Sequence, residues 1–467
     1  MTPCGVVWYS QVMRPDGRAS GENGKAGPLR RTVWRWLRPG LGVKRWFAVI
    51  IAGMALIGLG VAVLLLDLYR SHPESPWLAI LSMRALPREV RALIFGLSGF
   101  GLVAFAILRL NRVLLAPYMR PGKPVVEAVA EHRRRGRGPR VVALGGGTGL
   151  AALLRGMKHH TTNLTALVTV ADDGGSSGRL RRTLGLPPPG DLRNCLAALS
   201  DDEDLLTQLF QYRFGDEDEL TGHSFGNLLI AALAGVTGSF DRGVLEAGRV
   251  LAIRGRVLPS TLLDVALVAD KELALGSNAI RVEGESRIPQ TPGSIRRVHL
   301  EPAEPPAHPE AIRAVLGADL IVIGPGSLYT SILPNLLVPD LADAIRASRA
   351  LKVFVCNVAT QPGETDDYDC GRHIQALEAH GGRGLIDVAL VNDHQEGSLP
   401  QGQSWVCATD DGLVLVPLHR ADLADRAQPW RHDASRLAST LIALLEEHTG
   451  PLLPPSQDGP GGTAALG

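Results

Sequence analysis

The sequence has little of what marks a disulfide-stabilised or zinc-binding protein. Its 467 residues include five cysteines, an odd number with no C-x-x-C pair. Neither a disulfide framework nor a zinc site of that spacing is expected, and the composition suits a reducing cytosol. The cysteines are Cys4, Cys195, Cys356, Cys370 and Cys407. Charge of one sign is not in excess either. The formal net charge is +1, which removes any global reason to expect a nucleic-acid partner.

Two nucleotide-binding fingerprints are missing as well. Residues 145–149 read GGGTG, but Leu150 stands where the dinucleotide fingerprint G-x-G-x-x-G requires its third glycine. No Gly-Lys-Ser/Thr follows, so the segment is not a P-loop. The missing glycine argues against a nicotinamide-dependent oxidoreductase, which is therefore the weakest functional hypothesis for this chain. What remains is a different kind of phosphate site, or a tight turn without a ligand.

The pattern around this segment favours the phosphate site. The apolar run at residues 141–144 predicts a buried strand, and apolar residues from Leu150 to Met157 recur with the spacing of one helix face. The first N–H groups of a helix lack an intrahelical acceptor and lie at the positive end of its dipole, so they attract anions. We therefore expect a phosphate at the backbone of Gly145, Gly146, Gly147, Thr148 and Gly149.

A second turn of the same kind lies further along the chain. Residues 319–323 predict a buried strand that runs into Gly324-Pro325-Gly326-Ser327 and then a helix. Ser327 can cap that helix or offer its hydroxyl to an anion. Strands and helices alternate throughout this region, which predicts an α/β domain with a mainly parallel sheet covered on both faces. Because ligands bind beyond the carboxyl ends of such strands, two turns at that edge suggest a bound diphosphate.

Polar residues near these turns are candidates for chemistry. The strand at residues 164–170 ends in Asp172 and Asp173, which can accept a ribose hydroxyl or hold Mg²⁺ beside phosphates. Turn formation or helix capping is the alternative role for both. His223 precedes an apolar helix and is a candidate general base or phosphate donor, with a structural role equally open.

Two smaller predictions concern the connections. Asp191 precedes apolar residues at helical spacing, so it is expected to be the N-cap of that helix. Residues 283–300 contain two short strand-like runs and predict a hairpin or a small excursion with its own strands.

The first quarter of the chain has a different character. Residues 1–41 show no sustained periodicity and are predicted to be disordered. Within residues 42–112, the uncharged run 46–66 and the apolar run 92–108 predict two helices of a transmembrane hairpin, because about 20 apolar residues span a bilayer core. Basic residues on both outer flanks place those flanks in the cytoplasm, so the protein is expected in the cell membrane with its main domain cytoplasmic.

Two further segments complete the predicted organisation. Residues 113–139 form a basic linker, which is either a solvated spacer or a segment attracted to anionic lipid head groups. Residues 448–467 are rich in proline and glycine and predict a disordered tail.

Six strings in residues 140–447 together resemble one family. They are GGGTGL at 145, DDGGSSGRLR at 172, PPGDLRNCL at 188, GHSFGNL at 222, GPGSLYTSILPNLL at 324 and CNVATQPGET at 356. In this order they resemble the YvcK, or gluconeogenesis factor, branch of the CofD-like proteins. The resemblance implies a Rossmann-like, three-layer, doubly wound fold. The predicted membrane hairpin lies outside the core family.

The resemblance also implies two kinds of function. Transferase relatives move a 2-phospholactyl group from a guanosine diphosphate adduct to a deazaflavin with Mg²⁺. The gluconeogenesis factor branch binds UDP-sugars, notably UDP-N-acetylglucosamine, and is needed for cell shape and wall synthesis during gluconeogenic growth. The string DDGGSSG is typical of this second branch, so binding is the leading hypothesis and Mg²⁺-dependent transfer the second. Partners in cell-wall synthesis and homo-oligomerisation stay open, as does whether any reaction is catalysed.

By this resemblance the candidate residues fall into three groups. Residues 145–149 together with Gly324, Gly326 and Ser327 hold the diphosphate. Asp172, Asp173 and Asn194 approach the ribose, the sugar or a metal ion. His223, Ser224 and Asn227 orient the sugar side.

Overall fold

The chain divides into two compact units, residues 1–131 and 132–467, which we describe separately. A computed structural model describes residues 53–63, 66, 68, 70, 83, 85–115, 138–200, 205–215, 220–273, 278–408 and 416–450. The predictions for residues 1–41, for the linker from residue 116 to 137 and for the tail from residue 451 lie outside this part of the chain.

The first unit contains helical residues 53–63 and the long helix α4 (Arg88–Leu115), which includes the second predicted membrane span. Apolar side chains of α4 are exposed, with Phe100 73% and Leu102 70% accessible. In the described part of the chain, no helix combines the length and the apolar character that crossing a bilayer requires. The structure therefore does not support the predicted hairpin, whose first span begins outside the described residues.

The second unit is built around a seven-stranded sheet in which every pairing is parallel. The strand order is β10-β9-β8-β7-β1-β2-β3. The strands are β1 (Val141–Gly145), β2 (Leu164–Val168), β3 (Arg256–Pro259), β7 (Leu320–Ile323), β8 (Leu351–Val355), β9 (Val388–Asn392) and β10 (Leu418–Ala421). The chain builds outward from β1 to β3 and then returns to start again at β7. The order therefore reverses between β1 and β7, which is where ligands bind in doubly wound sheets.

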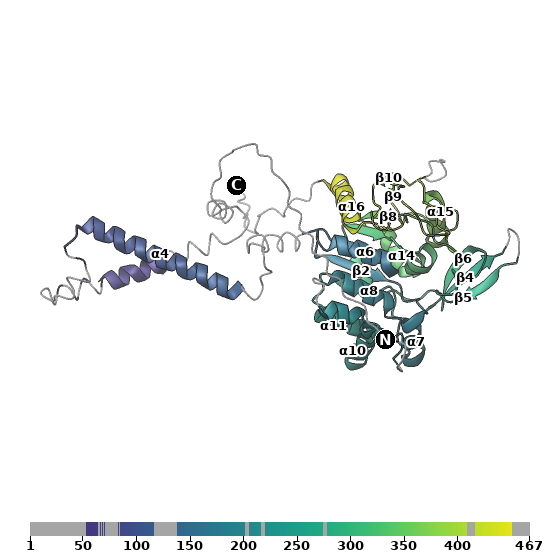
Figure 1. The fold of residues 1–467 in the computed structure, drawn as a ribbon, viewed down its shortest axis with the longest axis horizontal. Coiled ribbons are helices and arrows are strands. Elements are labelled where there is room, and N and C mark those ends of the chain that lie inside the picture. The colour runs from purple at the N-terminus through teal and green to yellow at the C-terminus, as the bar shows by residue number, and fades with distance from the viewer. Residues whose placement is uncertain are drawn as a thin grey trace, which may run out of the picture. The chain divides into compact units, whose positions relative to one another are not determined.

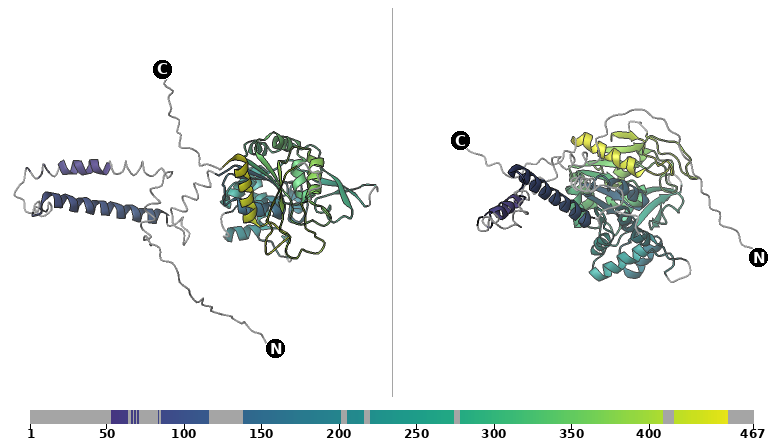
Figure 2. Two further views of the ribbon diagram at one scale, coloured as in Figure 1. Left: turned by 90° about the horizontal axis from the view of Figure 1, so that it is seen from above. Right: turned by 60° about the vertical axis from the view of Figure 1, so that its left-hand side comes forward.

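Helices cover both faces of this sheet (Figures 1 and 2), as the complete burial of β1, β2, β7 and β8 requires. In one group, α6 (Gly147–Met157) contacts both α8 (Gly190–Leu199) and α16 (Ala434–Thr449), and α6 and α8 pack on β2. A second group comprises α12 (Pro309–Leu316), α13 (Leu333–Leu336), α14 (Pro339–Ala347) and α15 (Cys370–Gly381). The predicted mainly parallel, doubly wound α/β fold is confirmed.

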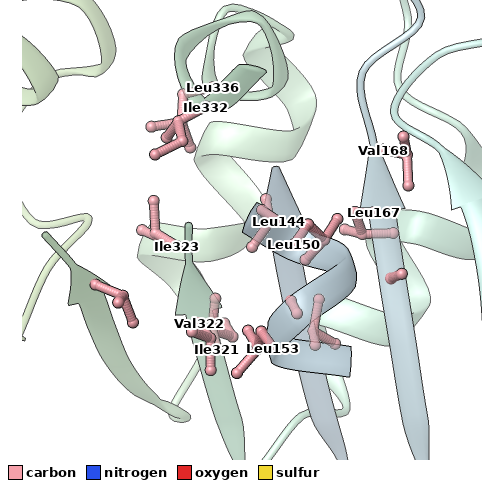
Figure 3. Packing of buried hydrophobic residues seen from close by; sticks show 14 of the residues in the cluster. Leu144, Leu150, Leu153, Leu167, Val168, Ile321, Val322, Ile323, Ile332 and Leu336 are labelled. Carbon is pink, nitrogen blue, oxygen red and sulfur yellow. The ribbon is translucent and has the colours of Figure 1, made fainter. Parts of the chain in front are cut away.

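Further helices extend the domain beside α8. They are α7 (Gly175–Leu184), α9 (Leu205–Gln211), α10 (Phe225–Thr237) and α11 (Phe240–Val250). Leu150 and Leu153 of α6 bury their side chains over the central strands, next to Leu144 and Leu167 (Figure 3). The apolar periodicity that predicted this helix is therefore the face that packs on the sheet and fixes the helix N-terminus beside β1.

A second, antiparallel sheet stands at one edge of the domain (Figure 1). It contains β4 (Ala266–Glu272), β5 (Ile280–Glu283) and β6 (Ser294–Glu301) in the order β5-β4-β6. The predicted excursion with its own strands is thus confirmed. Lys271 in β4 is fully buried, and its ammonium group donates to the carbonyl oxygens of Ile288 (2.9 Å) and Gly363 (3.0 Å). The bond to Gly363 fastens the small sheet to the loop that follows β8, and the bond to Ile288 stays within the small sheet's own connection.

Candidate functional site

The two glycine turns lie against each other at the carboxyl edge of the sheet. β1 and β7 are neighbours in register, with Leu144 opposite Ile323, so their turns begin at the same level. A Cβ atom on Gly149 would lie 2.7 Å from the carbonyl oxygen of Pro325, and one on Gly326 would lie 3.4 Å from that of Gly146. This approach of two backbones leaves no room for a side chain at Gly149, which is the physical reason for glycine there.

Side chains from neighbouring elements fix both turns. The amide nitrogen of Asn335 in α13 donates to the carbonyl oxygen of Gly145 (3.1 Å). The amide nitrogen of Asn357, just after β8, donates to the carbonyl oxygen of Gly326 (2.9 Å), and that of Gln361 donates to the hydroxyl of Ser327 (2.8 Å). The loop after β8 therefore supports the second turn.

The turns border a first cavity of about 280 Å³. Its walls come from both turns, the loop after β8 and the segment before α16, and include Thr148, Ser327, Gln361, Arg431 and His432. Backbone N–H groups, hydroxyls and a guanidinium make this wall suited to phosphate oxygens. Asn357, Gln361 and Arg431 were not among the candidates predicted from the sequence.

His432 contributes a buried neutral imidazole to this wall. Its Nε2–H group donates to the carbonyl oxygen of Cys356 (3.1 Å), and burial lowers its pKa to about 4 from 6.5. In the unfolded chain the same group takes up a proton near pH 6.5, so the unfolded state binds more protons between pH 6.5 and pH 4. The free energy of unfolding therefore falls as the pH is lowered from 6.5 to 4.

We expect His432 to destabilise the domain by about 2 kcal/mol at pH 5 relative to pH 7.5. Urea unfolding at the two pH values measures this difference. The variant His432→Gln should show a smaller loss between the same pH values. An equal loss in both proteins would assign the acid sensitivity to other groups.

Asp191 does not have the position predicted for it. Helix α8 begins at Gly190 after an N-cap at Pro189, so Asp191 lies within the first turn. Its carboxylate instead accepts the backbone N–H of Gly147 at the start of α6. Burial, followed by the nearby charge of Asp172, raises the pKa of Asp191 to about 6. One of the N–H groups expected to bind phosphate is therefore already used inside the protein, and the later N–H groups of the turn remain for a ligand.

Three carboxylates gather beside this helix start. Asp172 and Asp173 follow β2, and Glu285 comes from the turn after β5 in the small sheet. Each offers an oxygen, and these oxygens all lie within 4.8 Å of one another. The backbone N–H of Ser286 donates to Asp173 (2.9 Å), and that of Gly174 donates to Asp172 (2.8 Å). The turn after β5 of the small sheet therefore places Glu285 beside the two aspartates.

The electrostatics of these carboxylates suit a cation. Burial, then the charges of Asp172, Asp191, Glu364 and Asp173, raises the pKa of Glu285 to about 8. Burial also raises the pKa of Asp172. Like charges gathered at half-buried positions are costly even with the guanidinium of Arg193 nearby, and carboxylate oxygens are the ligands that Mg²⁺ prefers. The residues present therefore fit a divalent cation. Glu285 was missed because nothing in its local sequence links it to Asp172.

A second cavity of about 250 Å³ adjoins the carboxylates. Its walls include Asp172, Ser176, Arg193, Asn194 and Asn227. It also borders Asp191. A Cβ atom added to Gly146, which lines the first cavity, would lie 2.4 Å from the carboxylate of Asp191. The two cavities are therefore neighbours on either side of the Asp191 carboxylate.

The remaining predicted residues surround this second cavity. Asn194 and Asn227 lie in its wall. Ser224 is fully buried at the N-cap of α10, where its hydroxyl accepts the backbone N–H of Asn227 (3.2 Å). His223 contacts Ser176 and Arg179 behind the wall. Sequence reasoning missed Ser176 and Arg193, although both fall inside the strings that resemble the family.

Known proteins are similar to this chain over most of its length. The sequence pattern of the family described as 2-phospho-L-lactate transferase CofD matches residues 141–448. A candidate gluconeogenesis factor from Nostoc sp. is 49% identical over 434 residues, covering 88% of this chain and 92% of that protein. The gluconeogenesis factor of Bacillus subtilis is 46% identical over 321 residues, covering 67% of this chain and 100% of that protein.

A solved structure extends the similarity to the fold. The crystal structure of a UPF0052 family member from Bacillus halodurans aligns with a TM-score of 0.61 at 44% identity, covering 65% of this chain and 99% of that one. The sheet domain accounts for the whole length of this relative and of the Bacillus subtilis one. The Nostoc alignment is longer than the sheet domain, so that relative also shares part of the region before it.

Proposed function

Because the chain belongs to the CofD-like family, in the branch of the gluconeogenesis factors, we propose that its sheet domain binds a nucleotide sugar. The ligand we infer is a uridine diphosphate sugar such as UDP-N-acetylglucosamine. The observation that carries this proposal is the contact between the two glycine turns at the reversal of the strand order, with a polar cavity beside them. Such a place in a doubly wound sheet is where nucleotides bind.

In this proposal the diphosphate and the sugar of the ligand occupy different cavities. The diphosphate lies in the first cavity, against the N–H groups of Thr148 and Gly149, the Ser327 hydroxyl and the Arg431 guanidinium. The sugar lies in the second cavity, where Asn194 and Asn227 meet its hydroxyl and amide groups. Together the cavities match the size range of small-molecule sites, which is about 300–1,000 Å³.

Thermal unfolding with a nucleotide panel tests the proposal. A ligand at a hundredfold excess over its Kd stabilises the native state by about 2.7 kcal/mol. We expect UDP-N-acetylglucosamine to raise the melting temperature and NAD to leave it unchanged. Failure of every uridine nucleotide to stabilise the protein would overturn the proposal.

We also propose that this binding supports cell-wall synthesis and cell shape during growth on gluconeogenic carbon. The name of the Bacillus subtilis relative, gluconeogenesis factor, supports the link to gluconeogenic growth, and the role in wall synthesis and shape is what the family resemblance implies. Deletion of the gene in its own organism is the test. Normal growth and normal shape of the deletion strain on a gluconeogenic carbon source would refute this role.

A second candidate function is a Mg²⁺-dependent transfer from a nucleotide diphosphate adduct. The specific observation in its favour is the triad of Asp172, Asp173 and Glu285. A bound divalent cation would neutralise phosphate charge beside the second cavity. Turnover of a nucleotide adduct with Mg²⁺, lost in Asp173→Asn, would favour transfer over binding alone.

The variant Glu285→Gln should have opposite effects on the free and the Mg²⁺-loaded protein. Because its pKa is about 8 in the folded protein, Glu285 must take up a proton on folding at neutral pH, and glutamine removes that cost, so the metal-free protein should be more stable by about 1 kcal/mol or more. Losing a carboxylate ligand should weaken Mg²⁺ binding by roughly tenfold or more. Melting curves with and without Mg²⁺ measure both effects. Stabilisation by Mg²⁺ that is equal in the variant and the wild type would exclude Glu285 as a ligand.

The N-terminal region is proposed to attach the domain to the cytoplasmic face of the cell membrane. The support is the uncharged apolar run at residues 46–66 and the exposed apolar side chains of α4. Sedimentation of membranes from cells that produce the full-length chain tests this. Recovery of the protein in the supernatant would end the proposal without affecting nucleotide binding.

A further inference from the structure

A chain of hydrogen-bonded side chains lies behind the second cavity. The guanidinium of Arg179 donates through Nε to Nε2 of His223 (3.1 Å) and through Nη2 to the carbonyl oxygen of Thr221 (2.7 Å). A guanidinium only donates, so Nε2 of His223 must accept. The proton of the neutral imidazole is therefore fixed on Nδ1. Burial and the charge of Arg179 lower the pKa of His223, which keeps the ring neutral.

This tautomer determines what the Ser176 hydroxyl can do. Nδ1–H of His223 lies 3.0 Å from Oγ of Ser176 and donates to it. The side-chain amide of Asn227 donates to the same oxygen (3.1 Å). A hydroxyl accepts two hydrogen bonds and donates one, so both lone pairs are occupied. Within the described part of the chain the Ser176 proton has no acceptor, and Ser176 lies in the cavity wall while only 4% exposed.

The same cavity wall also contains a buried hydrogen-bond acceptor, the side-chain amide oxygen of Asn227. Oδ1 of Asn227 is buried without a hydrogen-bond partner among the described residues, and Asn227 is 1% exposed. Unpaired buried polar atoms are costly until a ligand completes them. The carboxylates of Asp172 and Asp191 in this wall are balanced by the guanidinium groups of Arg193 and Arg213, so the lining carries no excess charge that calls for an ionic ligand group. Nε and Nη1 of Arg193 in the same wall are further donors without a partner among the described residues, so a neutral group that both accepts and donates matches the lining.

We propose that Arg179 and His223 are positioning residues that present the Ser176 hydroxyl as a fixed donor to a neutral acceptor oxygen on the sugar part of the ligand. An N-acetyl group fits best, since its carbonyl oxygen accepts from the Ser176 hydroxyl and its N–H donates to Oδ1 of Asn227. A sugar hydroxyl also fits. This inference rests on the proposed nucleotide-sugar binding and assigns the sugar to the second cavity.

Calorimetric titration of the full-length protein with UDP-N-acetylglucosamine and with UDP tests this assignment. Ser176→Ala should weaken binding of the nucleotide sugar about tenfold and leave UDP unchanged, because one hydrogen bond to the sugar is lost. His223→Ala should act in the same way. His223→Asn keeps an N–H donor near the position of Nδ1 and should restore affinity to within about threefold. Ser348→Ala is the matched control, since Ser348 is equally buried but donates to the carbonyl of Val315.

The outcomes separate this inference from the function on which it rests. If the wild type binds neither nucleotide, both proposals are overturned. If it binds UDP-N-acetylglucosamine but Ser176→Ala binds it equally well, or weakens UDP to the same extent, only the Ser176 assignment is overturned. Nitrogen-15 NMR of the wild type gives a readout that needs no variant to fold. We expect His223 to be protonated on Nδ1, and protonation on Nε2 would contradict the proposal.

Discussion

Replacing Gly149 by alanine should abolish nucleotide binding at ligand concentrations that saturate the wild type. The new Cβ atom would lie 2.7 Å from the carbonyl oxygen and 2.9 Å from the carbonyl carbon of Pro325. Real Cβ atoms do not approach backbone this closely, so the two turns must separate. Separated turns no longer hold the diphosphate, and each hydrogen bond to a charged group that is lost weakens binding by about 1.5–3 kcal/mol, or roughly ten- to hundredfold. Calorimetric titration with UDP-N-acetylglucosamine measures the loss.

The chain offers a matched control for this substitution. Gly235 lies in helix α10, and a Cβ atom added to it would meet no neighbouring atom within 4 Å, so Gly235→Ala adds the same methyl group to open space. This variant should bind the nucleotide normally and be slightly more stable, because alanine favours a helix by about 1 kcal/mol over glycine. Undiminished binding by Gly149→Ala would show that the close approach of the turns is not needed for the ligand.

Replacing Gly156 by valine should cost about 3 kcal/mol or more of unfolding free energy. A Cβ atom on Gly156 in α6 would lie 1.9 Å from the carbonyl oxygen of Ala434 and 2.9 Å from the Cβ atom of Ala438. Both belong to α16, so the two helices cross with their backbones in contact. Neither neighbour is the mobile end of a side chain, and the helices must move apart. Urea unfolding of the variant and the wild type measures the cost.

Gly235→Val controls for the effect of valine in a helix without a tertiary neighbour, and should change the unfolding free energy by less than about 1 kcal/mol, because valine is no worse a helix former than glycine. Equal losses in Gly156→Val and Gly235→Val would mean that α6 and α16 are not held by this crossing. Because α6 carries the first glycine turn at its other end, we also expect Gly156→Val to weaken nucleotide binding. That coupling connects the stability of the helix pair to the site.

Local sequence signals predicted the parts of the site that depend on local geometry. A buried strand, a glycine turn and an amphipathic helix leave a clear pattern, so residues 145–149 and Gly324 to Ser327 could be located from the sequence. The alternation of strands and helices likewise predicted the parallel sheet. That the two turns meet follows from the strand order, since β1 and β7 are adjacent although about 180 residues separate them.

The parts that were missed depend on contacts between distant segments. The N-cap rule assigned Asp191 to its own helix, but its carboxylate has a partner in α6, and such a partner leaves no local signal. Glu285 comes to Asp172 through the small antiparallel sheet, whose turn is fastened by the bond from Ser286 to Asp173. Ser176 acquires its role from His223 and Asn227, which belong to another segment.

Hydrogen–deuterium exchange with and without UDP-N-acetylglucosamine tests most directly whether the two turns form one nucleotide site. Saturating ligand should slow exchange in peptides covering both residues 145–150 and residues 324–330, because their backbone N–H groups and hydroxyls hold one diphosphate. NAD should slow neither. Protection confined to another part of the chain, or no protection at either turn at saturating ligand, would contradict the account.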